Sequence, residues 1–193
     1  MTGQYRTTGQ HRTKTLIVAA AVLAVGTAFL AGCARTQIDD FSERSPKLVL
    51  ERFFEGRTEG WGIVQSRFGT LERQFRVKAD GVWDDAAQTL RLTETWTFDD
   101  GQVDRLQWNI RRLGSGQYVG SEARLVGEAK GEQAGNAFRW RYTRRVPMPD
   151  GDERQLDFDD WFWLQDETVL ISRASIGRFG MEFATISLFY QKP

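Results

Sequence analysis

Residues 90–110 read LRLTETWTFDDGQVDRLQWNI, and this stretch decides the fold. Both of its halves alternate apolar and polar side chains with a period of two, the period of a β-strand with one face in a protein core. The positions that share the apolar parity are Leu90, Leu92, Glu94, Trp96 and Phe98, then Leu106, Trp108 and Ile110. Asp99-Asp100-Gly101 stands between the halves, and an Asp-Gly pair flanked by alternating segments indicates a hairpin turn. The stretch therefore predicts two antiparallel strands that share one core face.

The same pattern recurs on both sides of this hairpin. Further apolar positions of one parity are Phe75, Val77 and Ala79, then Phe138, Trp140 and Tyr142, then Leu156, Phe158, Phe162 and Leu164. Glycine-containing turns separate these segments, and residues 48–193 show no helical periodicity over helical length. We therefore expect an all-β protein, an antiparallel up-and-down β-barrel of about eight to ten strands that is lipocalin-like, because closure removes both sheet edges. A β-sandwich is the alternative.

The barrel is not expected to span a membrane, because its outward positions carry Arg, Lys and Asp where lipid would require an apolar band. The positions of the aromatic residues also restrict how the two strands around the turn near Gly151 can pair. Aromatic positions on both sides of the turn near Gly151 are even, so even residues must pair with even residues if both sets face the core. One register that satisfies this places Arg141 opposite Asp159, and the other places Arg145 opposite Asp157.

The first residues have the composition of a secretion signal. A basic segment precedes an uncharged apolar run at residues 16–31. The run closes with Leu30-Ala31-Gly32-Cys33, which resembles the lipobox of bacterial lipoproteins. We expect residues 1–32 to be a lipoprotein signal peptide and the Cys33 thiol to carry the lipid that anchors the chain. A transmembrane helix is the alternative, but the run is slightly shorter than the ~20 residues that a bilayer requires.

Ala34, rather than Asp, follows the cysteine, and this favours attachment to the outer membrane, facing the periplasm. The polar residues 33–47 lack a periodic apolar pattern, so we expect the lipidated N-terminus to continue into a flexible tether. Residues 48–54 predict either a short helix or the first strand. We expect residues 48–193 to form a single barrel domain, whose length suits one domain.

Composition excludes several classes of site. The chain has one Cys, Cys33, and one His, His11, which lies in the predicted signal peptide. The mature chain therefore offers no His or Cys for zinc, copper or haem, and none for Ser-His-Asp or Cys-His catalysis. The 26 basic and 26 acidic residues balance, so no surface for nucleic acid is expected. We expect no cofactor and no metal; the acidic run 157–160 does not suggest calcium, because a strand turns its carboxylates to opposite faces.

Three charged residues fall on apolar faces. Glu94 and Asp160 each interrupt such a face, and Arg173 continues one. Burying a charge is unfavourable unless the charge is paired. We predict that Glu94, Asp160 and Arg173 lie inside the barrel and bind the polar end of a ligand, with Trp96 and Trp108 as walls. The alternative is a satisfied structural cluster, or a position at the barrel mouth where water reaches the charges.

A basic run overlaps the aromatic segment at residues 138–142. Its members are Arg139, Arg141, Arg144 and Arg145. Because the aromatic side chains take the other face of the strand, we expect these arginines to form a solvated face that pairs with nearby acids. A stacking platform for single-stranded nucleic acid would need the arginines and the aromatic rings on one face.

Several short motifs carry a resemblance to a known family. They are Trp61-Gly62, Arg67-Phe68-Gly69, Val126-Gly127-Glu128-Ala129, Phe138-Arg139-Trp140-Arg141-Tyr142, Phe158-Asp159-Asp160-Trp161 and Arg178-Phe179-Gly180. In these motifs and in the lipobox the chain resembles the domain of unknown function 3833 (DUF3833) family, uncharacterised proteobacterial lipoproteins, from about Phe53 to Pro193. The resemblance implies no established activity, cofactor or site.

Two functions from different classes fit these observations. In the first, a lipid-anchored barrel binds a small amphipathic or lipidic ligand, as the tryptophan-rich interior favours. In the second, a solid barrel docks an envelope protein partner. An enzyme that works with carboxylates and arginine alone would need a cleft in which Glu94 and Asp160 converge, and the sequence leaves that question open.

Overall fold

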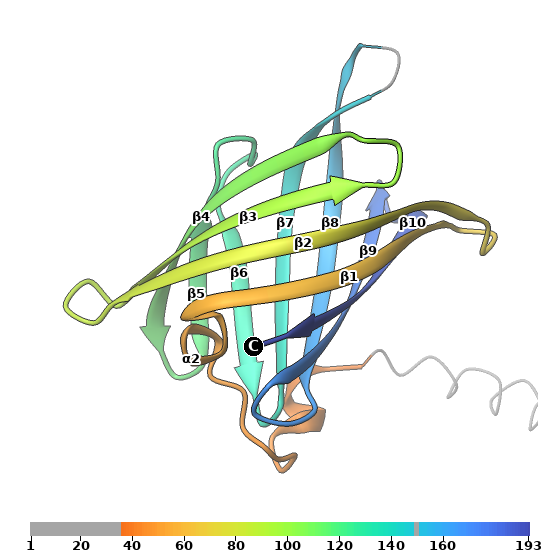
Figure 1. Cartoon of the computed structure of the whole chain (residues 1–193). Coiled ribbons are helices and arrows are strands. Elements are labelled where there is room, and N and C mark those ends of the chain that lie inside the picture. Colours follow the sequence, from red (N-terminus) through yellow and green to blue (C-terminus); the bar gives the residue numbers. More distant parts are fainter. Residues whose placement is uncertain (1–35, 149–150) are drawn as a thin grey trace, which may run out of the picture. The chain divides into compact units, whose positions relative to one another are not determined.

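The structure, a computed structural model, describes residues 36–148 and 151–193. Gln37–Pro193 forms one compact unit that consists mostly of β-strands (Figure 1). Its elements in chain order are η1 (Ile38–Phe41), α2 (Leu50–Phe54), β1 (Gly56–Ser66), β2 (Leu71–Asp84), β3 (Thr89–Phe98), β4 (Val103–Gly114), β5 (Gln117–Ser121), β6 (Ala129–Ala134), β7 (Ala137–Pro147), β8 (Glu153–Leu164), β9 (Val169–Arg178) and β10 (Met181–Gln191). The predicted signal peptide and Cys33 lie outside the described residues.

The strands close into a barrel. Each strand pairs antiparallel with its neighbours in sequence, and β1 pairs with β10 to complete the circle. The closing pair runs from Glu59 opposite Gln191 to Ser66 opposite Ala184. The predicted all-β up-and-down barrel is therefore confirmed, with ten strands, and the sheet is not divided into the two layers of a sandwich.

The alternation in residues 90–110 has the consequence that the sequence predicts. Leu90 and Leu92 of β3 are buried, as are Trp108 and Ile110 of β4, and Leu92 lies opposite Trp108. The polar residues between them face outward. Because the side-chain period of a strand is two, this single pairing fixes the inward face of both strands.

The β7–β8 hairpin has one of the two predicted registers. Arg141 lies opposite Asp159, so even residues pair with even residues, whereas Arg145 lies opposite Gln155. The ion pair on this outer face nevertheless runs diagonally. The Arg139 guanidinium donates through Nε to Asp159 Oδ1 at 2.7 Å.

The sequence predicts either a short helix or the first strand over residues 48–54, and the structure has the helix α2 there. In Figure 1, α2 lies at the lower end of the barrel, beside the start of β1. Phe53 and Phe54 of this helix are buried in the core. The helix lies close to β2 because Gly81 has no side chain: a Cβ at that position would come within 2.0 Å of the Phe54 carbonyl oxygen.

Polar contacts hold α2 in place. The buried carboxylate of Glu51 accepts a hydrogen bond from Arg112 Nη1 at 2.6 Å and another from the Tyr118 hydroxyl at 3.0 Å. At the other end of the helix, Lys192 Nζ donates to the carbonyl oxygens of Arg52 and Glu55. The lower end of the barrel is thus closed by a short helix whose buried charge is paired.

The described part of the predicted tether also packs on the barrel. The Phe41 ring of η1 lies 5.7 Å from the ring of Trp161 on the outer face of β8. Leu48 is fully buried, and its N–H donates to the Gly135 carbonyl at 2.9 Å. The prediction of a flexible tether over 33–47 is therefore wrong for residues 37–47, and the barrel unit begins before residue 48. One aromatic residue in a polar segment gives no periodic signal, so sequence pattern did not reveal this contact.

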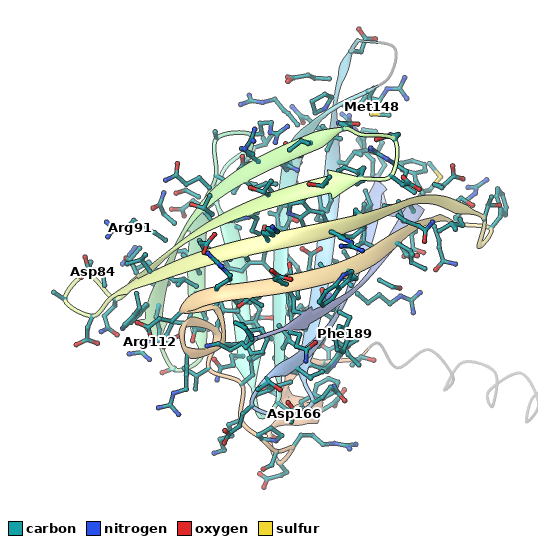
Figure 2. The ribbon with its side chains drawn as sticks, in the orientation of Figure 1. Asp84, Arg91, Arg112, Met148, Asp166 and Phe189 are labelled. Atoms are coloured by element: carbon teal, nitrogen blue, oxygen red, sulfur yellow. The ribbon has the colours of Figure 1, made fainter. Side chains whose placement is uncertain are left out.

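The upper end carries the β1–β2, β3–β4, β5–β6, β7–β8 and β9–β10 connections, and no helix of the described residues lies across it. Figure 2 shows Met148 at this end, and Asp84 and Asp166 at the closed end. Within the part of the chain that the structure describes, no helix is both long enough and apolar enough to cross a membrane.

Candidate functional site: a cavity inside the barrel

A cavity of about 590 Å³ lies inside the barrel. Leu50 and Phe54 of α2 form its floor, and it reaches Asp100, Gln102 and Met148 around the upper turns. Its volume lies in the range of ~300–1,000 Å³ that is typical of small-molecule sites. The helix at one end and the turns at the other therefore give the cavity a closed floor and an accessible mouth.

Aromatic rings make up much of the wall. Tyr142 and Phe158 stack at 4.9 Å between ring centroids with an interplanar angle of 7°, and Trp108 meets Tyr142 edge-on at 5.2 Å. Trp96 packs on Phe75 at 4.7 Å. The structure thus places Trp96 and Trp108 on the cavity wall, where the sequence predicts them.

Asp160 projects from β8 into this cavity and is only 8% exposed. The Tyr142 hydroxyl donates to its Oδ2 at 3.0 Å. Its Oδ1 is buried, and no described residue offers it a hydrogen bond. Burial raises the pKa of Asp160 to about 8, repulsion from Asp159 and Glu94 acts in the same direction, and the Tyr142 hydrogen bond opposes them. At neutral pH the group is mainly a neutral acid, which can both donate and accept.

Glu94 projects from β3 into the same cavity and is 6% exposed. Both of its oxygens have partners: the Tyr190 hydroxyl donates to Oε1 at 3.1 Å, and Trp96 Nε1 donates to Oε2 at 3.4 Å. Burial raises the pKa of Glu94, and the two hydrogen bonds partly oppose this shift. Glu94 is therefore satisfied by the protein, whereas Asp160 retains a free oxygen.

The buried Arg144 of β7, which the sequence assigned to the solvated basic face, is one of three arginines that line the cavity, with Arg73 and Arg124. The structure corrects that prediction, since Arg144 is buried and lines the cavity. Its Nη2 donates to Asp104 Oδ2 at 3.2 Å, and its Nε lies 3.4 Å from Glu122 Oε2 without hydrogen-bond geometry. Arg124 also pairs with Asp104. Arg144 has the same even parity as Tyr142 and the aromatic residues before it, and this shared parity could have identified Arg144 as an inward residue.

Arg173 does not belong to the site. It lies on the outer face of β9, exposed, opposite Trp161 of β8. The inward residues of β9 are Leu170, Ser172 and Ala174. The prediction of an internal Arg173 is therefore wrong, because the β-branched residues on its parity are outward: Ile171 is 42% exposed.

The arrangement suits an amphipathic guest. Most of the lining is apolar, while Asp160, with its unsatisfied oxygen, and the buried Arg144 supply polar groups within the cavity. Among residues 36–148 and 151–193, no group of three His, Cys, Asp or Glu side chains is placed to hold a metal ion. The cavity can therefore bury an apolar group and make a few directed hydrogen bonds to a polar one.

Solved structures with a similar fold have low sequence identity to this chain. An S-type phycobiliprotein lyase from Guillardia theta matches with a TM-score of 0.55 and 11% identity over 82% of this chain and 99% of its own. A protein of unknown function of the DUF3598 family, from Nostoc punctiforme, matches with a TM-score of 0.54 and 13% identity over 83% of this chain. The chain spans about half of that protein, 53% of its length. These likenesses show a lipocalin-like fold. No curated protein matches the chain.

Family membership follows from the sequence itself. Residues 27–192 match the family described as protein of unknown function, DUF3833. This match covers all ten strands together with α2, and it confirms the family resemblance carried by the short motifs. The chain belongs to the DUF3833 family.

Proposed function

We propose that this protein is an envelope lipoprotein whose barrel binds a small amphipathic or lipidic molecule. The observation that carries the proposal is the cavity of about 590 Å³, in which a buried oxygen of Asp160 has no partner among the described residues. Buried polar atoms in proteins are nearly always hydrogen-bonded, so an exception inside a cavity marks a place for a ligand atom. A solid barrel that docks an envelope partner would not need this space.

The polarity of the site indicates how such a ligand would lie. Its apolar part would occupy the lower cavity, against Leu50 and Phe54, and its polar group would lie near Asp160 and Arg144. A neutral Asp160 donates a hydrogen bond, and Arg144 is a cation. The group that fits both is an oxygen acceptor such as a carboxylate, phosphate or ester, rather than an amine.

The location belongs to the same proposal. We infer that residues 1–32 are removed as a signal peptide and that the lipidated Cys33 holds the barrel at the outer membrane, on the periplasmic side. The lipobox-like sequence Leu30-Ala31-Gly32-Cys33 supports this inference. The lipocalin-like fold shared with the phycobiliprotein lyase supports small-ligand binding.

The test is native mass spectrometry of the full chain purified from its host, followed by extraction and identification of anything bound. We expect a reproducible small molecule on the wild-type protein and on Asp160→Asn, because an amide still donates a hydrogen bond. Asp160→Leu should lower the occupancy several-fold. Asp157→Leu is the matched control, since Asp157 is exposed on the outward face of the same strand.

Circular dichroism would verify that each variant is folded. A wild-type barrel that is empty in every preparation would contradict the proposal, as would full occupancy of Asp160→Leu. Loss of the ligand from Asp160→Asn would show instead that the polar group of the ligand requires an ionised carboxylate.

A further inference from the structure

Two neighbouring hairpin tips at the upper end carry the same tripeptide. Arg67-Phe68-Gly69 forms the β1–β2 turn, and Arg178-Phe179-Gly180 forms the β9–β10 turn. The tips are adjacent because β1 pairs with β10 at the closure of the barrel. The Arg67 N–H donates to the Phe183 carbonyl at 2.9 Å, which ties one tip to the other.

Both tips expose their aromatic rings to solvent. Phe68 is 79% exposed and Phe179 is 82% exposed, and Leu71, Met181 and Phe183 beside them are also exposed. Single exposed apolar residues are normal on a protein surface, but a group of five on two adjoining tips indicates an interaction site.

The turn does not explain the aromatic residue. Phe179 and Gly180 have φ angles of +53° and +77°. A two-residue turn with two positive φ angles favours Asn at its first position, and a bulky side chain is disfavoured there. Phe179 therefore occupies this position against the preference of the backbone.

Each exposed ring is accompanied by a cation. The Arg67 guanidinium lies 4.6 Å from the centre of the Phe68 ring, and that of Arg178 lies 4.7 Å from the centre of the Phe179 ring. Neither arginine has a carboxylate within 4 Å among the residues described. Each tip therefore offers an apolar ring and a positive charge that no described carboxylate neutralises; Arg178 Nη1 also donates to the Gln155 carbonyl at 3.0 Å.

We propose that these two tips insert into the surface of a phospholipid bilayer. The Phe68 and Phe179 rings would enter the boundary between headgroups and acyl chains, and Arg67 and Arg178 would donate to lipid phosphates. Two protruding rings, each with its own arginine, suit a fluid surface, whereas a protein partner would have to supply two matched pockets. Glu182, which is exposed beside the tips, accepts a hydrogen bond from Ser175 and retains its charge, so the contact with phosphate depends on Arg67 and Arg178.

Docking in this way turns the mouth of the cavity toward the bilayer. Val64 and Ile186 line the cavity and belong to strands that run into the two tips. An amphipathic molecule could then pass between bilayer and cavity without crossing water. The inference rests on the tips alone, however, and holds whether or not the cavity contains a ligand.

Photo-crosslinking in the full chain tests it. Benzoylphenylalanine, which is similar in shape to Phe, is placed at position 68, at position 179 or, as control, at position 82, in chains reconstituted in vesicles of phosphatidylethanolamine and phosphatidylglycerol. Val82 is 56% exposed on the outer face of β2, toward the closed end. We expect phospholipid adducts by mass spectrometry at 68 and 179, several-fold more abundant than at 82. Arg67→Glu combined with Arg178→Glu should reduce the adducts at 68 several-fold with an unchanged melting midpoint.

Each of four other outcomes would overturn the inference. Equal lipid adducts at all three positions would show that the bilayer contact is not made by the tips. A covalent dimer would assign the tips to a second copy of this chain, and an adduct to another protein would assign them to a protein partner. No adduct at 68 and 179 would leave the tips without a bilayer contact. Ligand occupancy is measured separately, so an empty cavity would contradict the proposed function and leave this inference intact.

Discussion

The closed end of the barrel differs from its cavity and its open end in whether carboxylate oxygens are hydrogen-bonded and aromatic rings are buried. At the closed end, both carboxylate oxygens of Glu51 accept hydrogen bonds and the aromatic rings of α2 are buried. Inside the cavity, Asp160 keeps an oxygen that has no partner among the described residues, and at the open end Phe68 and Phe179 are exposed to solvent. The closed end thus follows the rules that stabilise a fold, whereas the cavity and the open end depart from them. Such departures in an otherwise consistent chain are expected where a protein binds something.

The largest expected difference in stability comes from replacing Phe by Ala once at each end of the barrel. Phe54→Ala removes a buried ring that meets Tyr190 edge-on at 5.3 Å and forms the cavity floor. We expect it to lower the free energy of unfolding by about 3–5 kcal/mol. Phe68→Ala, at a ring that is 79% exposed, should change it by less than about 0.5 kcal/mol. Denaturant unfolding measures both, and similar losses at the two positions would show that the ends do not differ as described.

The second prediction uses pH. The pKa of Asp160 is raised to about 8 in the folded protein from an ordinary 3.8, so the folded state holds a proton that the unfolded state releases between these values. Stability is therefore fully present at low pH and falls as pH rises through this window. Between pH 5 and 8 we expect a loss on the order of 2–4 kcal/mol, and the raised pKa of Glu94 acts in the same direction.

Asp160→Asn should flatten this pH dependence and make the protein more stable than the wild type at pH 8. Asp166→Asn is the control: hydrogen bonds from Thr168 lower the pKa of Asp166, so its contribution is lost only below this window. A stability that is constant, or rises, from pH 5 to 8 would contradict a neutral buried Asp160.

The contrast between β3 and β9 shows how far sequence could predict the structure. In β3, apolar residues occupy one parity only, so its inward face, with Glu94 on it, was predictable. In β9 both parities carry aliphatic residues, so alternation does not identify the inward face, and the prediction that Arg173 points inward is wrong. The correct choice depends on the register with β8, where Leu164 lies opposite Leu170. The length of the turn between them fixes that register, and the turn was not predictable from its polar residues.

The remaining differences arise from contacts between distant parts of the chain. Arg144 is buried because Asp104 and Glu122 come to it from earlier segments, and no local pattern reports such pairing. The two Arg-Phe-Gly tripeptides are visible in the sequence, but only the closure of β1 on β10 brings them together. Alternation along a strand is local, so it could be predicted. Closure of the barrel decides which strands and turns become neighbours, and therefore which acids contact which arginine.

The smallest expected effect concerns the residue that was placed on the wrong face. Arg173 is exposed on the outer wall, so Arg173→Ala should change the free energy of unfolding by less than about 0.5 kcal/mol and leave ligand occupancy unchanged. The same substitution at Arg144 would leave the carboxylates of Asp104 and Glu122 with Arg124 as their only cation among the described residues, and the loss should be several times larger. Unfolding and native mass spectrometry on the two variants compare an outward and an inward arginine directly. Equal effects would mean that the difference in burial between these two positions has no energetic consequence, and the role assigned to Arg144 in the cavity would then have to be withdrawn.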